Sequence, residues 1–336
     1  MRDHGGDLDR AIARFGGPEA EWIDLSTGIN RRPWPLPAIP DHAWRRLPTA
    51  QDHAGLLAAA RAAWQVPADL AGVALAGAQA AIQSIPRLRT PGAARVLAPT
   101  YNEHAATLAA QGWQVGECAT LGALAGADLA VVVNPNNPDG RRHAPGALRA
   151  LAGQVGLLVV DESFGDADPG LSLLPGGGGG ALVLRSFGKF WGLAGLRLGF
   201  AFRPDEVVAG LRALAGPWPV SGAAIAAGTA ALADRDWAAA MRATLVQDAA
   251  RADALARAAG WAVLGGTTLF RLYGTGDAGA AQAHLARHRI WSRIFPGAPG
   301  RLRLGLPGPE AEWVRLAAAL WDRAPVPPSP PRTPLL

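Results

Sequence analysis

Short apolar segments rich in β-branched residues alternate with helix-like segments through the middle of the chain, and this alternation restricts the possible folds more than any other feature. Strand-like segments are found at 94–100, 127–140, 156–164, 176–189 and 197–203, and helix-like segments at 53–64, 102–113 and 145–155, while 72–88 reads as strand, tight turn and helix. Such alternation is typical of a mostly parallel sheet with helices on both faces. We therefore predict an α/β fold.

The two ends of the chain depart from this pattern and predict further parts. Residues 1–40, which end in the proline-rich "RRPWPLPAIP", are expected to form an arm that contributes to the smaller domain and to the active site. Residues 41–215 are expected to form the large α/β domain and 216–324 a smaller α+β domain. The tail "PVPPSPPRTPLL" (325–336) is rich in proline and is predicted to be disordered.

The composition argues against several classes of protein. The 336 residues carry a net charge of +5, but the basic pairs are scattered without aromatic residues between them, so no nucleic-acid partner is expected. The charged start "MRDHGGDLDR" does not resemble a secretory signal, and no apolar run is long enough to cross a membrane. With Cys118 as the single cysteine, no intrachain disulfide and no cysteine-based zinc site can form. We expect a cytoplasmic protein without a metal.

Lys189 is the only lysine among 32 basic residues, and it lies in the glycine-bracketed turn "SFGKFWG" after a buried strand. An isolated lysine is usually a surface charge, but a deprotonated lysine can form a Schiff base with a carbonyl compound. Asp161, at the end of the strand "LLVVDES", fits a helix cap, an ion pair, or a carboxylate that holds a heterocyclic nitrogen protonated.

Two further turns follow predicted strands. "NPNNPDG" (134–140) has ideal turn residues and also places the amide of Asn137 where it could meet a ligand oxygen. The small-residue turn "AGAQAA" (76–81) opens a helix, whose free N–H groups can hold a phosphate.

Along the chain these four features come as small-residue turn, Asn-Pro turn, strand-end Asp161 and then Ser-x-x-Lys189 with an arginine eight residues on. In this order they resemble the fold-type I pyridoxal-phosphate enzymes of the aspartate aminotransferase superfamily. The resemblance spans about residues 1–322, and "SFGKFWGLAGLRLGF" is its most specific part. It implies pyridoxal 5'-phosphate as cofactor, with Lys189 as the Schiff-base lysine and Asp161 beside the pyridine nitrogen. It also implies that Asn137 bonds the ring hydroxyl oxygen and that Tyr101 stacks on the ring.

The same resemblance assigns the cofactor phosphate to Ser186, Arg197 and the backbone of Ala78 and Gln79. Two positions depart from common aminotransferase patterns, since many members have a tyrosine at each. Phe164 lacks a hydroxyl that would bond the ring oxygen, and Leu47 lacks one that would reach the partner subunit's phosphate. We expect the loss at Phe164 to change how the bound cofactor titrates.

The arm narrows the resemblance. "HGG" at 4–6 followed by "IDLSTGINRRPWP" (23–35) is similar to the threonine-phosphate decarboxylases of the cobalamin pathway. These enzymes convert L-threonine O-3-phosphate to (R)-1-amino-2-propanol O-2-phosphate and CO2. The resemblance implies that Arg303 holds the substrate carboxylate and Arg293 the phosphate. The remaining substrate-binding residues that it implies are His4, Gly5, Gly6 and Asn30.

Other readings remain open from the sequence. A histidinol-phosphate aminotransferase-like enzyme would use the same cofactor on another phosphorylated substrate, and no sequence feature shows which bond of the substrate breaks. A non-catalytic pyridoxal-phosphate-binding scaffold is the third reading. The superfamily resemblance also implies a homodimer with the active site at the interface.

Overall fold

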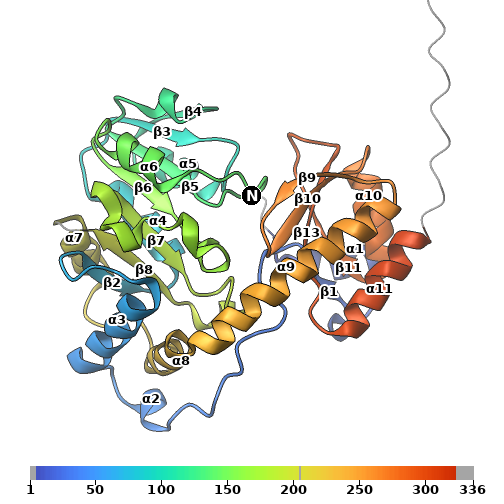
Figure 1. Cartoon of the computed structure of the whole chain (residues 1–336), viewed down its shortest axis with the longest axis horizontal. Helices are drawn as coiled ribbons and strands as arrows, with labels where there is room; N and C mark the ends of the chain where they lie inside the picture. Colours follow the sequence, from blue (N-terminus) through green and yellow to red (C-terminus); the bar gives the residue numbers. More distant parts are fainter. Residues whose placement is uncertain (1–4, 204–205, 323–336) are drawn as a thin grey trace, which may run out of the picture.

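In the computed structural model, which describes residues 5–203 and 206–322, a seven-stranded sheet forms the centre of the larger part of the chain (Figure 1). Its order is β2-β8-β7-β6-β5-β3-β4, and β8 is antiparallel to both of its neighbours while the other pairs are parallel. The strands are β2 (Ala71–Leu75), β3 (Ala93–Leu97), β4 (Gln114–Cys118), β5 (Leu129–Val133), β6 (Leu158–Asp161), β7 (Leu182–Ser186) and β8 (Gly199–Arg203). The predicted α/β fold is confirmed.

Strand β4 was not predicted, and its position explains why. It lies at the edge of the sheet, paired only with β3, and its residues are mostly exposed or half-buried. An edge strand of this kind needs no continuous apolar run, so "QVGEC" carries little strand signal.

Helices cover both faces of the sheet because successive strand side chains point to opposite faces. In β5, Ala130 and Val132 pack into one core cluster, whereas Leu129 and Val131 pack into the other. The first face is covered by α3 (Ala50–Trp64), α6 (Pro145–Ala152) and α8 (Gly222–Ala233), and the second by α4 (Ala78–Ser84), α5 (Glu103–Ala110) and α7 (Glu206–Ala215).

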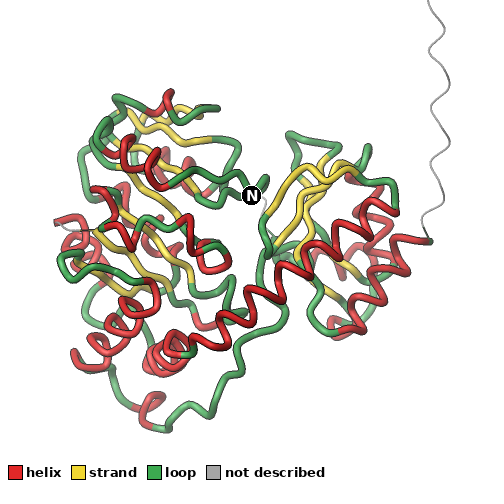
Figure 2. The backbone as a smooth tube through the Cα atoms, viewed as in Figure 1, coloured by secondary structure: helices red, strands yellow, loops and turns green. Residues whose placement is uncertain are grey.

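The smaller part contains an antiparallel sheet, whose strands are yellow on the right of Figure 2. Its four strands have the order β12-β13-β10-β9. The helices and strands of the smaller part include β9 (Ala262–Gly266), β10 (Phe270–Gly274), α10 (Ala278–Arg287), β11 (Ile290–Trp291), β12 (Arg293–Ile294), β13 (Arg301–Gly305) and α11 (Glu310–Trp321). The long helix α9 (Arg235–Ala258) joins the two parts, since Met241 packs into the larger core and Ala256 into the smaller one. The domain boundaries at residues 40 and 215 stay predictions. Helix α8, which follows residue 215 in the chain, packs against α3 of the larger part.

The N-terminal arm belongs to both parts (Figure 1). Its helix α1 (Leu8–Phe15) and strand β1 (Ile23–Asp24) lie in the smaller part, where β1 pairs with β11. The chain then returns to α2 (His42–Arg45), which packs against α8. His4 and the tail 325–336 lie outside the described residues. Within 5–203 and 206–322, no helix has the length and hydropathy needed to cross a lipid bilayer.

Candidate active site

A cavity of about 460 Å³ lies at the carboxyl edge of the large sheet, where it is closed by the smaller sheet and the arm. Segments that follow β2, β3, β5, β6 and β7 line it, because parallel strands bring their carboxyl ends to one edge. The structure brings together most of the predicted site residues in this lining: Gly5, Ala78, Gln79, Tyr101, Asn137, Asp161, Ser186, Lys189, Arg197, Arg293 and Arg303.

Lys189 points into this cavity from the turn after β7. Burial and the positive charge of Arg303 lower the pKa of its amine to about 8, against a smaller opposing effect of Asp161. The Nζ atom lies 5.9 Å from the centre of the Phe164 ring, so one wall beside the amine is apolar. A lysine in these surroundings has a substantial neutral fraction near physiological pH and can act as a nucleophile.

Asp161 ends β6, and its buried side chain lines the cavity. Its Oδ2 lies 2.9 Å from Nε2 of the buried His104, and its Oδ1 accepts hydrogen bonds from the backbone and the hydroxyl of Ser163. Burial alone would raise the pKa of Asp161, but the hydrogen bonds from His104 and Ser163 outweigh it and hold the pKa below its ordinary value. The carboxylate is therefore ionised and can stabilise a cation in the cavity.

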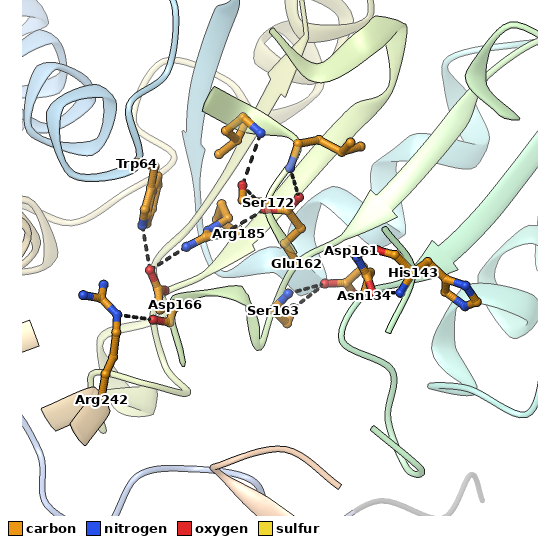
Figure 3. Close-up of polar contacts among 12 residues, drawn as sticks. Trp64, Asn134, His143, Asp161, Glu162, Ser163, Asp166, Ser172, Arg185 and Arg242 are labelled. Atoms are coloured by element: carbon orange, nitrogen blue, oxygen red, sulfur yellow. Dashed lines mark hydrogen bonds and ion pairs between the residues drawn. The ribbon is translucent and has the colours of Figure 1, made fainter. Parts of the chain in front are cut away.

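The adjacent Glu162 points the other way, as Figure 3 shows, because neighbouring residues at a strand end face opposite sides of the sheet. Its Oε2 accepts a hydrogen bond of 2.9 Å from Nη1 of Arg185, whose Nη2 donates to Oδ1 of Asp166 at 2.5 Å. All three side chains are buried. Asp166 also accepts from Nε1 of Trp64 at 2.6 Å. The acids at 161 and 162 thus divide between the cavity and a structural ion-pair network.

A cradle of small residues lies between the end of β2 and the start of α4. Gly77 has φ +83°, and a Cβ atom there would lie 2.8 Å from Nη2 of Arg197. A Cβ atom on Gly199 would lie 2.3 Å from the backbone N of Ala78. Close backbone packing, the first N–H groups of a helix and a guanidinium are a combination that suits a phosphate.

Tyr101 lies beside this cradle and its hydroxyl donates to Oε1 of Gln79 at 3.1 Å. Its ring meets the ring of His104 edge-on, with centroids 6.1 Å apart. The Tyr101 side chain lines the cavity next to His104. The stacking of its ring on a flat cofactor stays a prediction.

Two arginines face the cavity from the smaller sheet. Arg293 and Arg303 are directly opposite each other on β12 and β13, so their side chains share one face. Arg303 donates to the Oδ1 of Asn137 and, at 2.6 Å, to the carbonyl of Ser26. Burial and the charge of Arg293 lower the pKa of Arg303. Two neighbouring guanidinium groups would be stabilised by an anionic ligand.

Of the predicted residues in the arm, Gly5 belongs to this lining. Gly5 approaches the carbonyl of Ser26 so closely that a Cβ atom would lie 2.4 Å from it, and the N–H of Gly6 donates to the Ser26 hydroxyl at 2.7 Å. Asn30 is buried and does not line the cavity; its amide bonds the backbone after Lys189. Leu47 is 61% exposed on the surface.

Sequence reasoning missed His104, Ser163 and Gly28. His104 follows Tyr101 by three residues at the start of α5, and a histidine among the alanines of "NEHAATLAA" was the available signal. Gly28 needs the fold to be recognised: a Cβ atom there would lie 2.8 Å from the Phe164 ring and 2.9 Å from the Phe270 ring. The two rings meet edge-on with their centroids 4.9 Å apart. Glycine at position 28 lets the arm approach them.

The side chains fit the cofactor that the sequence resemblance implies. Pyridoxal 5'-phosphate offers an aldehyde, a ring nitrogen and a phosphate, and the cavity presents an amine with a lowered pKa, a buried carboxylate and a phosphate cradle. Each group is matched by a residue of complementary charge or reactivity.

Comparison with known proteins gives a consistent result. The sequence matches the family described as aminotransferase class I and II over residues 65–320. It is 43% identical to a threonine-phosphate decarboxylase of Pseudomonas aeruginosa, over 95% of this chain and 97% of the relative.

Two solved structures have a similar fold. The structure of histidinol-phosphate aminotransferase from Sinorhizobium meliloti, in complex with pyridoxal-5'-phosphate, superimposes with a TM-score of 0.81 at 23% identity over 95% of this chain and 94% of that one. L-threonine-O-3-phosphate decarboxylase from Porphyromonas gingivalis gives a TM-score of 0.72 at 19% identity over 88% and 98%.

Proposed function

Because the chain belongs to the class I and II aminotransferase family, we propose that it is a pyridoxal-phosphate-dependent enzyme that decarboxylates L-threonine O-3-phosphate. The products would be (R)-1-amino-2-propanol O-2-phosphate and CO2, and the amino alcohol would supply a link of the cobalamin side chain. One observation carries the proposal: Arg293 and Arg303 face the cavity that contains the only lysine. A substrate with both a carboxylate and a phosphate matches two guanidinium groups.

The cofactor, when bound, supplies an electron-accepting ring that stabilises negative charge at the substrate's α-carbon. Lys189 would hold it covalently and Asp161 would keep its ring nitrogen protonated. Ser186, Arg197 and the start of α4 would hold its phosphate, with Asn137 and Tyr101 beside the ring.

Arg303 would fix the substrate carboxylate and Arg293 the substrate phosphate, with Gly5 and Gly6 closing over the latter. Fixing both ends of the substrate sets the orientation of the bonds at its α-carbon. This orientation decides whether the carboxylate or the hydrogen leaves. Lys189 would return a proton from Nζ to the α-carbon, a step that suits an amine whose pKa is about 8.

An aminotransferase remains the second candidate, since the histidinol-phosphate aminotransferase of Sinorhizobium meliloti has the same fold. The test is to incubate the purified protein, loaded with cofactor, with L-threonine O-3-phosphate in the presence and absence of 2-oxoglutarate. The proposal expects CO2 and the amino alcohol phosphate without the keto acid, and neither product from Lys189→Ala. Turnover that requires 2-oxoglutarate and forms glutamate would establish the aminotransferase instead.

We also propose a homodimer, which the superfamily resemblance implies. Large apolar side chains are exposed on the segment before α3 and just before α8, and α2 packs against α8. The exposed apolar side chains are those of Leu36, Trp44, Leu47 and Trp218. Burying this surface in a second copy would remove apolar area from water. Sedimentation of a fully active monomer would contradict it. The cytoplasmic location stays a prediction.

A further inference from the structure

A short segment of the arm, residues 30–34, runs along the backbone of the turn that carries Lys189. The N–H of Asn30 donates to the carbonyl of Lys189 at 2.9 Å, and the N–H of Trp34 donates to the carbonyl of Trp191 at 2.9 Å. Between these two, Nδ2 of Asn30 donates to the carbonyl of Phe190 at 2.9 Å. Three successive carbonyl groups of the lysine turn are thus held by one segment.

Both polar atoms of the buried Asn30 side chain make hydrogen bonds. Its exposed fraction is 5%, and its Oδ1 accepts a hydrogen bond of 2.9 Å from the N–H of Arg32. The side-chain amide therefore accepts a hydrogen bond within its own turn through Oδ1 and donates one to the Phe190 carbonyl through Nδ2. It contributes nothing to the lining of the cavity, although the sequence resemblance assigns it to the substrate.

The contact is a close one that the surrounding residues enforce. Gly192 has φ +71°, and a Cβ atom there would lie 2.6 Å from the carbonyl oxygen of Asn30 and 2.6 Å from the Cα of Pro33. Only glycine permits the arm to lie this near to the lysine turn.

The segment is anchored to α11, to α9 and to the residue that precedes α9. Arg31 makes a two-pronged ion pair with Glu312 of α11, with N–O distances of 2.8 and 2.5 Å. Arg32 pairs with Asp248 of α9, and Nε1 of Trp34 donates to Asp234 at 3.0 Å. The arm is therefore held by rigid helices on one side, and Asn30 transmits that restraint to the Lys189 turn.

We propose that Asn30 is a positioning residue for Lys189, and that its amide fixes the turn from which the amine reaches the cofactor. This proposal rests on the proposed function, because it requires Lys189 to bind pyridoxal phosphate. A residue with this role affects cofactor attachment before any substrate is present. A residue that contacts substrate affects only the later steps.

The test compares the wild type with Asn30→Asp and Asn30→Ala. Aspartate keeps the size and the acceptor but replaces the Nδ2 donor by an oxygen that repels the Phe190 carbonyl. Trp34→Phe is the matched control: it removes a hydrogen bond of the same segment to Asp234 while leaving the three bonds to the lysine turn. Without substrate, we would measure the Kd for pyridoxal phosphate, the pH midpoint of its visible absorption and borohydride-stable labelling of Lys189. Thermal unfolding of each variant reports on folding.

Both Asn30 variants should bind the cofactor about 10-fold more weakly, the effect of losing one buried hydrogen bond, and should shift the pH midpoint. Trp34→Phe should change neither, because the ion pairs of Arg31 and Arg32 still anchor the segment. If Asn30→Ala fails to fold, the size-matched Asn30→Asp still gives the result. An unchanged cofactor Kd and pH midpoint, with a raised KM for L-threonine O-3-phosphate, would overturn the proposal in favour of substrate contact. A wild type that forms no borohydride-stable adduct at Lys189 would instead refute the proposed function.

Discussion

His104 Nε2 lies 2.9 Å from Asp161 Oδ2, and both side chains are almost completely buried. Because an ionised carboxylate can only accept a hydrogen bond, the ring nitrogen carries the hydrogen. The histidine thus favours the charged form of the carboxylate in a place where burial alone would favour the neutral form. Any cation that Asp161 stabilises in the cavity depends on this hydrogen bond.

Replacing His104 by alanine should raise the pKa of Asp161, because burial would be opposed by Ser163 alone. We expect cofactor affinity and kcat to fall by about 10-fold each, as for the loss of a hydrogen bond to a charged group. Titration of pyridoxal phosphate and steady-state kinetics measure the two effects.

His53→Ala is a suitable control for this substitution. His53 is a partly buried histidine of α3, it does not line the cavity, and burial lowers its pKa. A loss of affinity as large in this control would show that the effect of His104→Ala is not specific to Asp161.

Replacing Arg185 by methionine should destabilise the protein rather than alter its chemistry. The guanidinium is buried between Glu162 and Asp166, so its removal leaves two buried carboxylates without their partner. We expect a loss of about 3–5 kcal/mol in the free energy of unfolding. Urea unfolding of the cofactor-free protein measures it.

Borohydride labelling of Lys189 in the folded Arg185→Met variant separates stability from function. We expect the labelling to be retained at low temperature, because Glu162, Asp166 and Arg185 do not line the cavity. Complete loss of labelling in a folded variant would place Arg185 in the functional machinery.

The amine of Lys189 should titrate near pH 8 in the cofactor-free protein. At that pH we expect it to react with an acylating reagent about 100-fold faster than an ordinary lysine, which is almost fully protonated. Peptide mapping by mass spectrometry gives the rate, and because the chain has no other lysine only the N-terminal amine must be distinguished. A midpoint near 10.5 would contradict the buried environment.

Because the pKa of Lys189 is lower in the folded chain, the free energy of unfolding depends on pH. Between pH 8 and about 10.5 the unfolded chain binds more protons at this lysine than the folded chain, so folding becomes more favourable as pH rises through this window. Lys189→Met should therefore be more stable than the wild type at pH 7, and the difference should shrink toward pH 10. Urea midpoints at the two pH values measure this.

Arg303→Gln should raise the pKa of Lys189, because the guanidinium charge is the second cause of its lowering after burial. The expected result is slower acylation of Lys189 at pH 8, together with a KM for L-threonine O-3-phosphate at least 10-fold higher from the loss of a charged hydrogen bond. Arg301→Gln, an exposed arginine on the same strand, is the matched control. An unchanged pKa of Lys189 in Arg303→Gln would show that the charge of Arg303 does not contribute to lowering it.

The sequence by itself was enough to predict the α/β fold and the order of its turns, and to single out Lys189 and Asp161 as candidate site residues. These follow from local information: apolar periodicity, glycine and proline at turns, and a composition that retains a single lysine. Parallel strands then place whatever follows them at one sheet edge, which is why residues such as Asn137 and Ser186 come together as predicted.

Only the tertiary structure decided the partners of these residues. It separated Asp161 from Glu162, joined His104 to the former, and turned Asn30 from the cavity toward the lysine turn. Asn30 and Phe190 are 160 residues apart, and nothing in either segment indicates the other. Hydrogen bonds and burial depend on distances between such remote segments, and packing sets those distances only once the whole chain has folded.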